Sequence, residues 1–310
     1  MPVPSASFQS LQTIQLQLET WFGRPSPVIR YSVASILAGG HVLLEDIPGV
    51  GKTTFAYMLS QVLGLQFQRI QFTSDLMPSD ILGVEIYHKN SGSFEFQPGP
   101  IFRQLILADE LNRASPKTQS ALLQAMTDDF VDIGNHRHPL PQPFIIIATQ
   151  NPVSFAGTYP LPESQLDRFL VRLSLGYPPA KVEKHLLRKA SFHAGDIPEH
   201  EHAIQPLDVM RLRPCVDEVS VSDELVTYMH QLIELTRSHS KIRMGISLRG
   251  ALMWMRLCKA LALCFQRDYV IPDDIRNSFI PANQHRLIFS RQEHGEPVML
   301  EILDSVPFPI

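Results

Sequence analysis

The pattern of apolar positions in the first half of the chain predicts three buried strands. The apolar runs are HVLLE (41–45), QLILADE (104–110) and FIIIATQN (144–151), and each ends in polar residues. Their apolar positions are continuous rather than alternating, which is typical of strands covered on both faces in a parallel sheet. Because ligands bind beyond the carboxyl ends of such strands, the three polar ends are expected to meet at one site.

Helical spacing follows two of these runs. Apolar residues recur three and four positions apart over 55–63, and Gly64 stands where a C-terminal cap belongs. Ser115 followed by Pro116 predicts the start of another helix, because serine caps helix N-termini and proline favours the first helical position. The first half of the chain is therefore expected to be an α/β fold with a parallel sheet flanked by helices.

Two segments and a change of pattern complete the predicted architecture. Segments 83–100 and 130–144 each have two strand-like halves around a turn, which predicts β-hairpins projecting from the core. Beyond residue 178 the strand signal nearly stops, and the helices expected there cover 182–194, 223–237, 248–265 and 272–280, with a polar stretch at 195–222. We expect an α/β domain over 1–177 and a helical domain over 178–310 that ends in a helix and an extended tail.

Composition narrows the class of protein. A net charge of −4 gives no electrostatic signature of nucleic-acid binding, so nucleic acid is an unlikely partner. The N-terminus does not resemble a signal peptide and no apolar run approaches the ~18–20 residues of a membrane span, so a soluble cytoplasmic protein is expected. The three cysteines are interpreted as reduced thiols. Histidine pairs at 136/138 and 200/202 lack a convincing third ligand, which favours solvated loops over a metal site.

The stretch EDIPGVGKTT (45–54) is close to the phosphate-binding pattern G-x-x-x-x-G-K-[ST], with Asp46 in place of the first glycine. Gly49 and Gly51 would let backbone N–H groups approach phosphates, Lys52 would supply a charge, and the Thr53 hydroxyl could ligate Mg²⁺. A strand before the loop and a helix after it are what this mechanism requires, and the helix N-terminus favours anions. Asp46 opens the turn, where aspartate accepts unusual backbone angles, and it need not face the ligand.

The other two strand ends carry residues suited to phosphoryl transfer. Asp109 would point to the shell of a Mg²⁺ ion, and Glu110 to an attacking water; the alternative is a structural Asp-Glu pair. Asn151 could orient the same water, and the alternative is an Asn-Pro turn without a catalytic role.

Four stretches together resemble the MoxR family of AAA+ ATPases, in order and over nearly the whole chain. They are LLEDIPGVGKTT, GPIFRQLILADELNRASPKTQSALLQAM, FIIIATQNPVSFAGTYPLPESQLDRFL and GISLRGALMW. An aspartate at the start of the P-loop is a familiar variant in that family. The resemblance implies an AAA+ nucleotide-binding domain followed by a helical lid, with ATP and Mg²⁺ as cofactors.

The resemblance also implies roles for individual residues. Residues of the P-loop would bind the nucleotide: Gly49, Val50, Gly51, Lys52, Thr53 and Thr54. Asp109 matches the Walker B metal residue, Glu110 the catalytic base and Asn151 the first sensor. Arg168 matches the arginine finger that is given to the neighbouring subunit's ATP, and Arg249 the second sensor on the lid. Leu248 departs from the proline that the family often has there, which leaves the reach of Arg249 in question. Gly23 is the expected adenine contact.

Both arginines have support from the residues around them. Arg249 would lie in the first turn of a helix capped by Ser247, where a cation opposes the helix dipole unless an anion compensates it. Arg168 follows Asp167 and Glu163, so a local ion pair is the alternative to a finger. Arg113 is a candidate either for an intersubunit contact or for a structural ion pair.

The resemblance implies ATP hydrolysis in a ring, a hexamer, with ATP·Mg²⁺ between core and lid and Arg168 completing the site in trans. The resemblance implies a chaperone-like role in maturing client proteins, often with a partner that carries a von Willebrand factor A domain. The hairpins would help engage the client. The alternative is a nucleotide-gated scaffold with little turnover, and a nucleic-acid remodelling protein is the third possibility.

Overall fold

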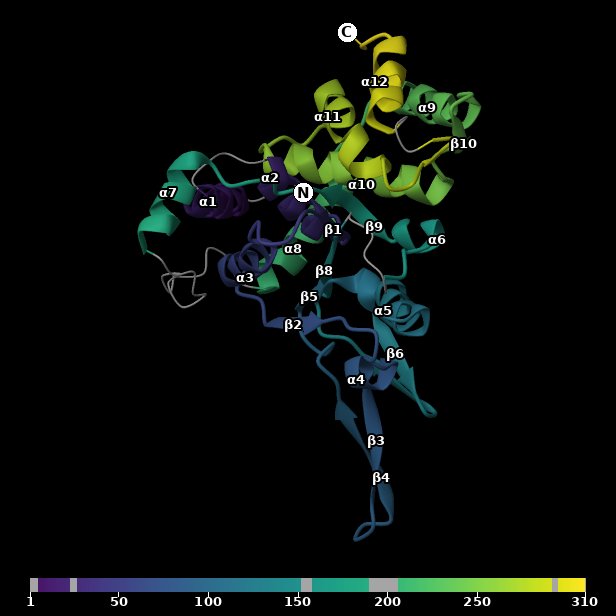
Figure 1. The fold of residues 1–310 in the computed structure, drawn as a ribbon. Helices are drawn as coiled ribbons and strands as arrows, with labels where there is room; N and C mark the ends of the chain where they lie inside the picture. The colour runs from purple at the N-terminus through teal and green to yellow at the C-terminus, as the bar shows by residue number, and fades with distance from the viewer. Residues whose placement is uncertain (1–4, 23–26, 152–157, 190–205, 292–294, 310) are drawn as a thin grey trace.

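A five-stranded parallel sheet, in the order β2-β5-β8-β1-β9, forms the centre of the computed structural model (Figure 1). The structure describes residues 5–22, 27–151, 158–189, 206–291 and 295–309. The strands of this sheet are β1 (His41–Glu45), β2 (Phe67–Gln71), β5 (Leu105–Asp109), β8 (Ile145–Gln150) and β9 (Phe169–Leu173). The three strands predicted from apolar runs are therefore present, and they occupy the middle of the sheet.

The two edge strands, β2 and β9, were missed by the sequence analysis. Strand β2 has only one buried residue, Ile70, because an edge strand needs less apolar cover. Strand β9 is apolar except for Arg172, whose guanidinium forms an ion pair with Glu45 on the adjacent β1. Short strands with charged residues therefore lack the continuous apolar run by which the central strands were found.

Helices cover the sheet on both faces. The N-terminal half contributes α1 (Ser5–Phe22), α2 (Pro27–Leu37), α3 (Lys52–Val62), α4 (Pro78–Leu82) and α5 (Pro116–Asp128). Ser115 caps α5 as predicted, since its side chain accepts a hydrogen bond from the Thr118 backbone, and Pro116 is the first helical residue. Gly64 adopts positive φ just after α3, as expected of a residue that ends a helix.

Both expected hairpins are present, and they point away from the C-terminal helices (Figure 1). The first pairs β3 (Gly83–His88) with β4 (Ser93–Pro98), and the second pairs β6 (Phe130–Ile133) with β7 (His136–Pro139). The hairpins touch each other, because His136 Nδ1 lies 3.1 Å from Glu85 Oε1 and the rings of Phe96 and His138 stack at 3.8 Å between centroids.

The second half of the chain is mainly helical. It contains α6 (Glu163–Leu166), α7 (Ala180–Lys189), α8 (Pro206–Glu218), α9 (Asp223–Ser238), α10 (Leu248–Cys264), α11 (Pro272–Asn283) and α12 (Gly295–Ser305), with a small ribbon of β10 (Ile242–Met244) and β11 (Ile288–Phe289). A short 3-10 helix, Leu111–Arg113, follows β5. The polar stretch expected at 195–222 is wrong for its second part, because α8 begins at Pro206 and buries Val209, Leu212 and Val216 against the core.

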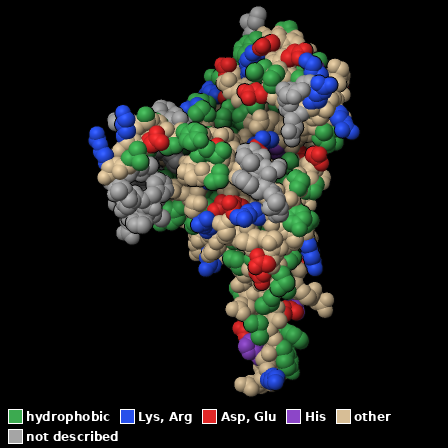
Figure 2. Space-filling view, viewed as in Figure 1, with side chains coloured by type: hydrophobic (Ala, Val, Ile, Leu, Met, Phe, Trp, Pro, Cys, Tyr) green, Lys and Arg blue, Asp and Glu red, His purple; other side chains and the backbone are tan. Residues whose placement is uncertain are grey.

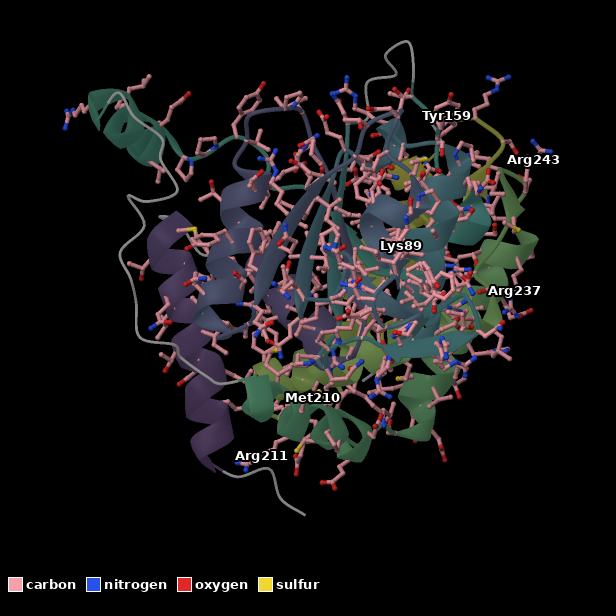
Figure 3. The ribbon with its side chains drawn as sticks, turned by 90° about the horizontal axis from the view of Figure 1, so that it is seen from below. Lys89, Tyr159, Met210, Arg211, Arg237 and Arg243 are labelled. Atoms are coloured by element: carbon pink, nitrogen blue, oxygen red, sulfur yellow. The ribbon has the colours of Figure 1, made fainter. Side chains whose placement is uncertain are left out.

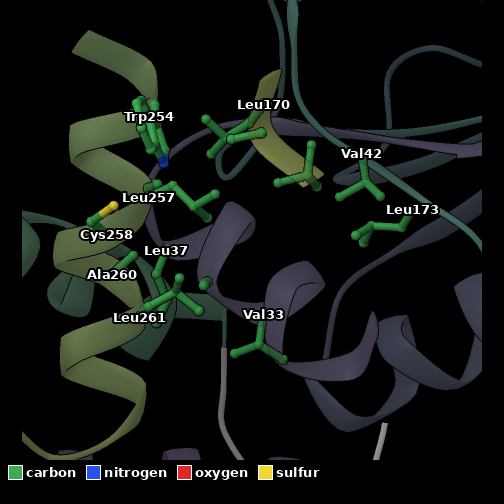
Figure 4. Packing of buried hydrophobic residues seen from close by; sticks show 14 of the residues in the cluster. Val33, Leu37, Val42, Leu170, Leu173, Trp254, Leu257, Cys258, Ala260 and Leu261 are labelled. Atoms are coloured by element: carbon green, nitrogen blue, oxygen red, sulfur yellow. The ribbon is translucent and has the colours of Figure 1, made fainter. Parts of the chain in front are cut away.

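Helix α10 ties the two halves together. Its buried residues Trp254, Leu257 and Leu261 belong to the same apolar cluster as Val33 of α2 and Leu170 of β9 (Figure 4). The domain boundary near residue 178 stays a prediction, because this cluster runs without a break from the sheet into the helical half. None of the helices in the described ranges is both long and apolar enough to cross a membrane.

Candidate functional site

The P-loop connects the end of β1 to the start of α3. Gly49 and Gly51 adopt φ of 84° and 94°, a region that side chains other than glycine disfavour. A Cβ built on either residue would have no atom within 4 Å, so the backbone on that side of the loop is open. Helix α3 begins at Lys52, which places Thr53 and Thr54 in its first turn. An anion could therefore approach the loop amides and the helix N-terminus together.

The side chain of Lys52 folds back onto the P-loop and binds to its backbone. Its Nζ donates to the backbone carbonyl oxygens of Asp46, at 2.6 Å, and Ile47, at 3.3 Å. Burial lowers the pKa of Lys52, and the carboxylates of Asp46, Asp109 and Glu110 oppose that shift. The ammonium group therefore lies within electrostatic reach of the acidic residues that end β5.

Asp46 does not face the phosphate side of the loop. It is 7% exposed, and its carboxylate accepts hydrogen bonds from Ser174 Oγ (2.6 Å), Leu175 N (2.6 Å) and Gly176 N (3.2 Å). Asp46 is not among the non-glycine residues with positive φ in the described part of the chain, so tolerance of unusual backbone angles is not the reason for this residue. Its carboxylate instead fixes the start of the P-loop to the exit of β9.

Asp109 lies at the end of β5 and is fully engaged. Its Oδ1 accepts from Thr149 Oγ1 at 2.6 Å, and its Oδ2 accepts from Arg69 Nε at 3.0 Å and Nη2 at 2.7 Å. Arg69 comes from β2 and Thr149 from β8, the two strands that flank β5. The predicted metal residue is thus held from both sides, and one of its partners is a cation.

Glu110 adopts a left-handed backbone conformation, with φ of 57°. Its amide donates to Thr149 Oγ1 at 2.9 Å, and its Oε2 accepts from Gln71 Nε2 and Arg113 Nη1, both at 2.8 Å. A non-glycine residue at positive φ costs free energy and is frequent at functional sites, because the surroundings must hold it there. For Arg113 the structure shows the ion pair that the sequence left open, while an intersubunit contact stays untested.

Asn151 directly follows β8, between the ends of β5 and β1. Its carbonyl oxygen lies 3.4 Å from Asn112 Nδ2. This position is on the same edge of the sheet as the P-loop, Asp109 and Glu110, so the three polar strand ends do meet as predicted. Gly23 lies outside the described residues.

Arg168 lies at the opposite edge of the sheet. It precedes β9, whose Phe169 pairs in parallel register with His41, the first residue of β1, whereas the P-loop follows the last residue of β1. A strand of this length spans roughly 15 Å, so Arg168 cannot reach its own P-loop. Its Nη1 donates to the Leu123 carbonyl and to Thr127 Oγ1 on α5. The alternative to a finger was a local ion pair of Arg168. Asp167 is not its partner, because the Asp167 carboxylate forms an ion pair with Arg286.

Arg249 accompanies Arg168 rather than the P-loop. Burial and, after it, the positive charge of Arg249 lower the pKa of Arg168. Ser247 caps α10 as predicted, with Gly250 N donating to its Oγ at 2.9 Å, and the same Oγ lies 3.5 Å from Asp167 Oδ2. The start of α10 is therefore held beside Asp167, at the edge of the sheet where Arg168 lies, and the role of Arg249 as the second sensor stays a prediction.

Sequence reasoning missed four residues at these two edges: Arg69, Gln71, Thr149 and Arg286. In the stretch FQRIQF (67–72) polar and apolar positions alternate only over 70–72, which is too short a strand signal to have placed the first two beside Asp109. Thr149 could have been found from its position, because it directly precedes the Gln-Asn pair at the end of a predicted strand. Arg286 carries no local signal of its role, because its partners beside Arg168, Asp167 and Phe169, are more than 100 positions away in sequence.

The residues at the P-loop edge fit a nucleotide with Mg²⁺. The loop is open above both glycines, Lys52 is a cation with a lowered pKa, and a threonine hydroxyl and one carboxylate are at hand as oxygen ligands. The described residues contain no group of three or more His, Cys, Asp or Glu that could hold a metal alone. A magnesium ion bound mainly by phosphates and water needs no such group.

Comparison with known proteins agrees with this geometry. Residues 41–171 match the ATPase family associated with various cellular activities (AAA), and residues 234–304 match the AAA lid domain. Chaperone MoxR1 of Mycobacterium tuberculosis is 36% identical over 285 residues, which cover 89% of this chain and 75% of that protein. The chain belongs to the MoxR family of AAA+ ATPases.

Two further relatives extend over the length of this MoxR-family chain. Protein YeaC of Bacillus subtilis is 43% identical over 291 residues, which cover 90% of this chain and 88% of that protein. The crystal structure of a candidate ATPase from Cytophaga hutchinsonii superposes with a TM-score of 0.85 at 34% identity, covering 98% of this chain and 96% of the other. The predicted fold class, an α/β AAA+ core followed by a helical lid, is confirmed.

Proposed function

We propose that this MoxR-family protein hydrolyses ATP with Mg²⁺ in a ring, and that hydrolysis drives chaperone-like maturation of client proteins in the cytoplasm. The observation that carries the proposal is the division of the site between two edges of one sheet. The P-loop, Asp109 and Glu110 lie at the carboxyl edge, whereas Arg168 lies at the other edge, where α10, the helix that carries Arg249, also begins. In this proposal the carboxyl edge of each chain binds that chain's own nucleotide, and the opposite edge completes the site of a neighbouring subunit.

At the carboxyl edge the chain binds and orients. The amides of residues 49–54 would surround the phosphates, and Lys52 would exchange the Asp46 and Ile47 carbonyl oxygens for phosphate oxygens. Thr53 and Asp109 would hold the magnesium ion. Bound ATP and Mg²⁺ supply the reactive phosphoryl group and neutralise its charge.

Glu110 is the base in this proposal. In the structure Gln71 and Arg113 both donate to its Oε2, which leaves Oε1, as far as the described residues go, as the oxygen that would accept from a water. Asn151 stands on the same edge and could share the orientation of that water. Phosphoryl transfer depends on positioning and charge more than on covalent chemistry, which suits such a rigid arrangement.

The opposite edge of the sheet would complete the nucleotide site of the neighbouring subunit. In a head-to-tail ring, such as a hexamer, the amino edge of one sheet can meet the P-loop of the next subunit. Arg168 and Arg249 would then act together in trans on one nucleotide. A polyphosphate would relieve the repulsion between these two neighbouring cations, and an arginine finger can contribute ~10³–10⁵ to the rate.

The hairpins form an arm suited to protein contacts. Several large apolar side chains on the first hairpin are exposed: Val84, Ile86, Tyr87 and Phe94. Hydrophobic and charged side chains alternate along the arm in Figure 2, and Lys89 marks its tip, which points toward the viewer in Figure 3. The name of the relative MoxR1 supports a chaperone role, and a protein with a von Willebrand factor A domain is the partner class that we propose.

A comparison of the parent with Glu110→Gln in a phosphate-release assay tests hydrolysis. The parent should turn over at least 100-fold faster, because the variant keeps the P-loop and loses the base. Equal background rates would instead favour the alternative, a nucleotide-gated scaffold. The same variant, held in ATP, should retain partner and client in a pull-down, with Lys52→Ala as the control that does not bind nucleotide.

A further inference from the structure

Arg286 is a buried cation at the junction of the lid and the sheet. It follows α11, and its side chain is only 2% exposed. Its Nε donates to Asp167 Oδ1 at 2.8 Å, and its Nη2 donates to the Phe169 carbonyl at 2.8 Å and approaches Met253 Sδ at 3.5 Å. Its Nη1 donates to the carbonyls of Leu170 and Ala282. A guanidinium has five N–H groups, and here each has an acceptor.

These acceptors bracket Arg168. Asp167 immediately precedes it and Phe169 immediately follows it, and Arg286 binds the side chain of the first and the carbonyl of the second. The backbone on both sides of Arg168 is therefore fixed by one side chain from the lid. Lysine could not replace it, because an ammonium has three donors and lacks the planar fork.

Arg286 also fixes the helix that carries Arg249. A Cβ built on Gly250 would lie 2.9 Å from Arg286 Cδ, so the first turn of α10 rests directly on this side chain. Ser247, the cap of α10, reaches Asp167 Oδ2 at 3.5 Å. Arg168 and Arg249 are thus held relative to each other through the pair of Arg286 and Asp167.

The cost of this arrangement points to a purpose beyond packing. A buried ion pair seldom stabilises a fold more than apolar residues of the same volume would, because both charges lose their hydration. Four backbone and side-chain acceptors besides Asp167 nevertheless converge on Arg286. Such a network is well suited to fixing a geometry within a fraction of an ångström, which a finger residue needs.

We propose that Arg286 is a positioning residue that, with Asp167, holds Arg168 and Arg249 in the geometry in which they act on a neighbouring subunit's ATP. It touches no nucleotide itself. The inference rests on the proposed trans role of Arg168. Its distinctive consequence is that a defect at Arg286 impairs the neighbour's site and leaves the P-loop of its own chain intact.

A subunit-mixing experiment tests this consequence. Glu110→Gln subunits do not hydrolyse ATP but carry an intact Arg168, so they can complete the site of a neighbour whose own finger is impaired. Arg286→Lys alone should lower ring ATPase activity at least tenfold with the ATP affinity of the isolated subunit unchanged. Mixing it with Glu110→Gln subunits should raise activity at least threefold above the sum of the two separate preparations.

Arg168→Ala mixed with Glu110→Gln is the matched control for the proposed function. If the Arg168→Ala mixture gains activity and the Arg286→Lys mixture does not, the positioning role is wrong and the finger assignment stands. If neither mixture gains, the trans role of Arg168 fails and the inference fails with it. When both Arg168 and Arg249 are already alanine, adding Arg286→Lys should cause no further loss of activity, and a further loss of threefold or more would also overturn the inference.

Asp167→Asn provides a second route should Arg286→Lys not fold. It keeps one oxygen acceptor for Arg286 Nε, removes the charge, and replaces the oxygen that faces Ser247 Oγ with an NH₂ group. The same gain on mixing with Glu110→Gln is expected, and its absence alongside a gain for Arg168→Ala would count against the proposal in the same way.

Discussion

Arg69 donates to Asp109 through two nitrogens, Nε at 3.0 Å and Nη2 at 2.7 Å, and both reach the same oxygen, Oδ2. Asp109 is the residue that would bind magnesium. In the structure the positive charge beside its carboxylate is the guanidinium group of Arg69. The Arg69 side chain is 48% exposed, which leaves it room to move away when a metal arrives. If Asp109 binds Mg²⁺ as proposed, Arg69 and the ion compete for this carboxylate.

Removal of Arg69 should make magnesium bind more readily. In Arg69→Ala the Mg²⁺ concentration for half-maximal binding of a fluorescent ATP analogue should fall roughly two- to fivefold, the equivalent of a half-exposed ion pair. Arg137→Ala is the matched control, because Arg137 is an exposed arginine that pairs with Asp132 on the second hairpin. A midpoint that stays the same or rises in Arg69→Ala would contradict this competition.

Asp46→Gly would restore the strict P-loop pattern, yet it should destabilise the protein. The change removes an acceptor shared by Ser174 Oγ and the amides of Leu175 and Gly176, and Leu175, like Asp46 itself, is buried. We expect a loss of about 2–4 kcal/mol in the free energy of unfolding by urea. Asp46→Asn, which keeps one oxygen acceptor, should lose less. An Asp46→Gly variant as stable as the parent would show that the hydrogen bonds from Asp46 to the residues after β9 do not stabilise the fold.

Asp46 also shows which parts of the structure could be predicted from the sequence. The central strands, the hairpins and the helix caps follow from local apolar periodicity and from Ser115 and Ser247, so they were predictable. The place of Asp46 was not, because its partners lie 128–130 positions away in sequence, in the loop that directly follows β9. The position of Arg249 was missed for a related reason. Its helix was correct, but the edge of the sheet where the helix begins is decided by the contacts of Asp167 and Arg286.

Gly250→Ala tests how tightly α10 rests on Arg286. Alanine favours a helix interior by about 1 kcal/mol over glycine, so an unhindered site would be stabilised. Here the new Cβ would lie 2.9 Å from Arg286 Cδ and 3.1 Å from Nε, inside contact distance of a buried side chain. We expect a lower melting temperature and a lower ring ATPase rate. Gly295→Ala is the control, since its nearest atom is 3.9 Å away. A stabilised Gly250→Ala with full activity would disprove the tight contact.

Two buried histidines should make the fold sensitive to mild acid. Burial lowers the pKa of His41 to about 4 from its ordinary value of 6.5, and burial also lowers the pKa of His285 well below that value. His41 is neutral in the fold, where Nδ1 accepts from Ile146 N at 3.0 Å and Nε2 can donate to the Met126 carbonyl at 3.1 Å. The unfolded chain takes up a proton below pH 6.5 while the folded chain does not. The stabilisation is therefore complete above that pH and is lost as the pH falls toward 4, by about 3 kcal/mol for His41.

Urea unfolding at pH 7.5 and at pH 5.0 measures this loss. His41→Gln can keep an acceptor and a donor for the same two backbone groups but does not titrate, so its stability should fall less between the two pH values. The carboxylates titrate alike in the parent and the variant, and the difference between them therefore isolates His41. His230→Gln, an exposed position on α9, should behave like the parent. If His41→Gln loses as much stability at pH 5.0 as the parent does, the proton taken up on unfolding belongs to other groups.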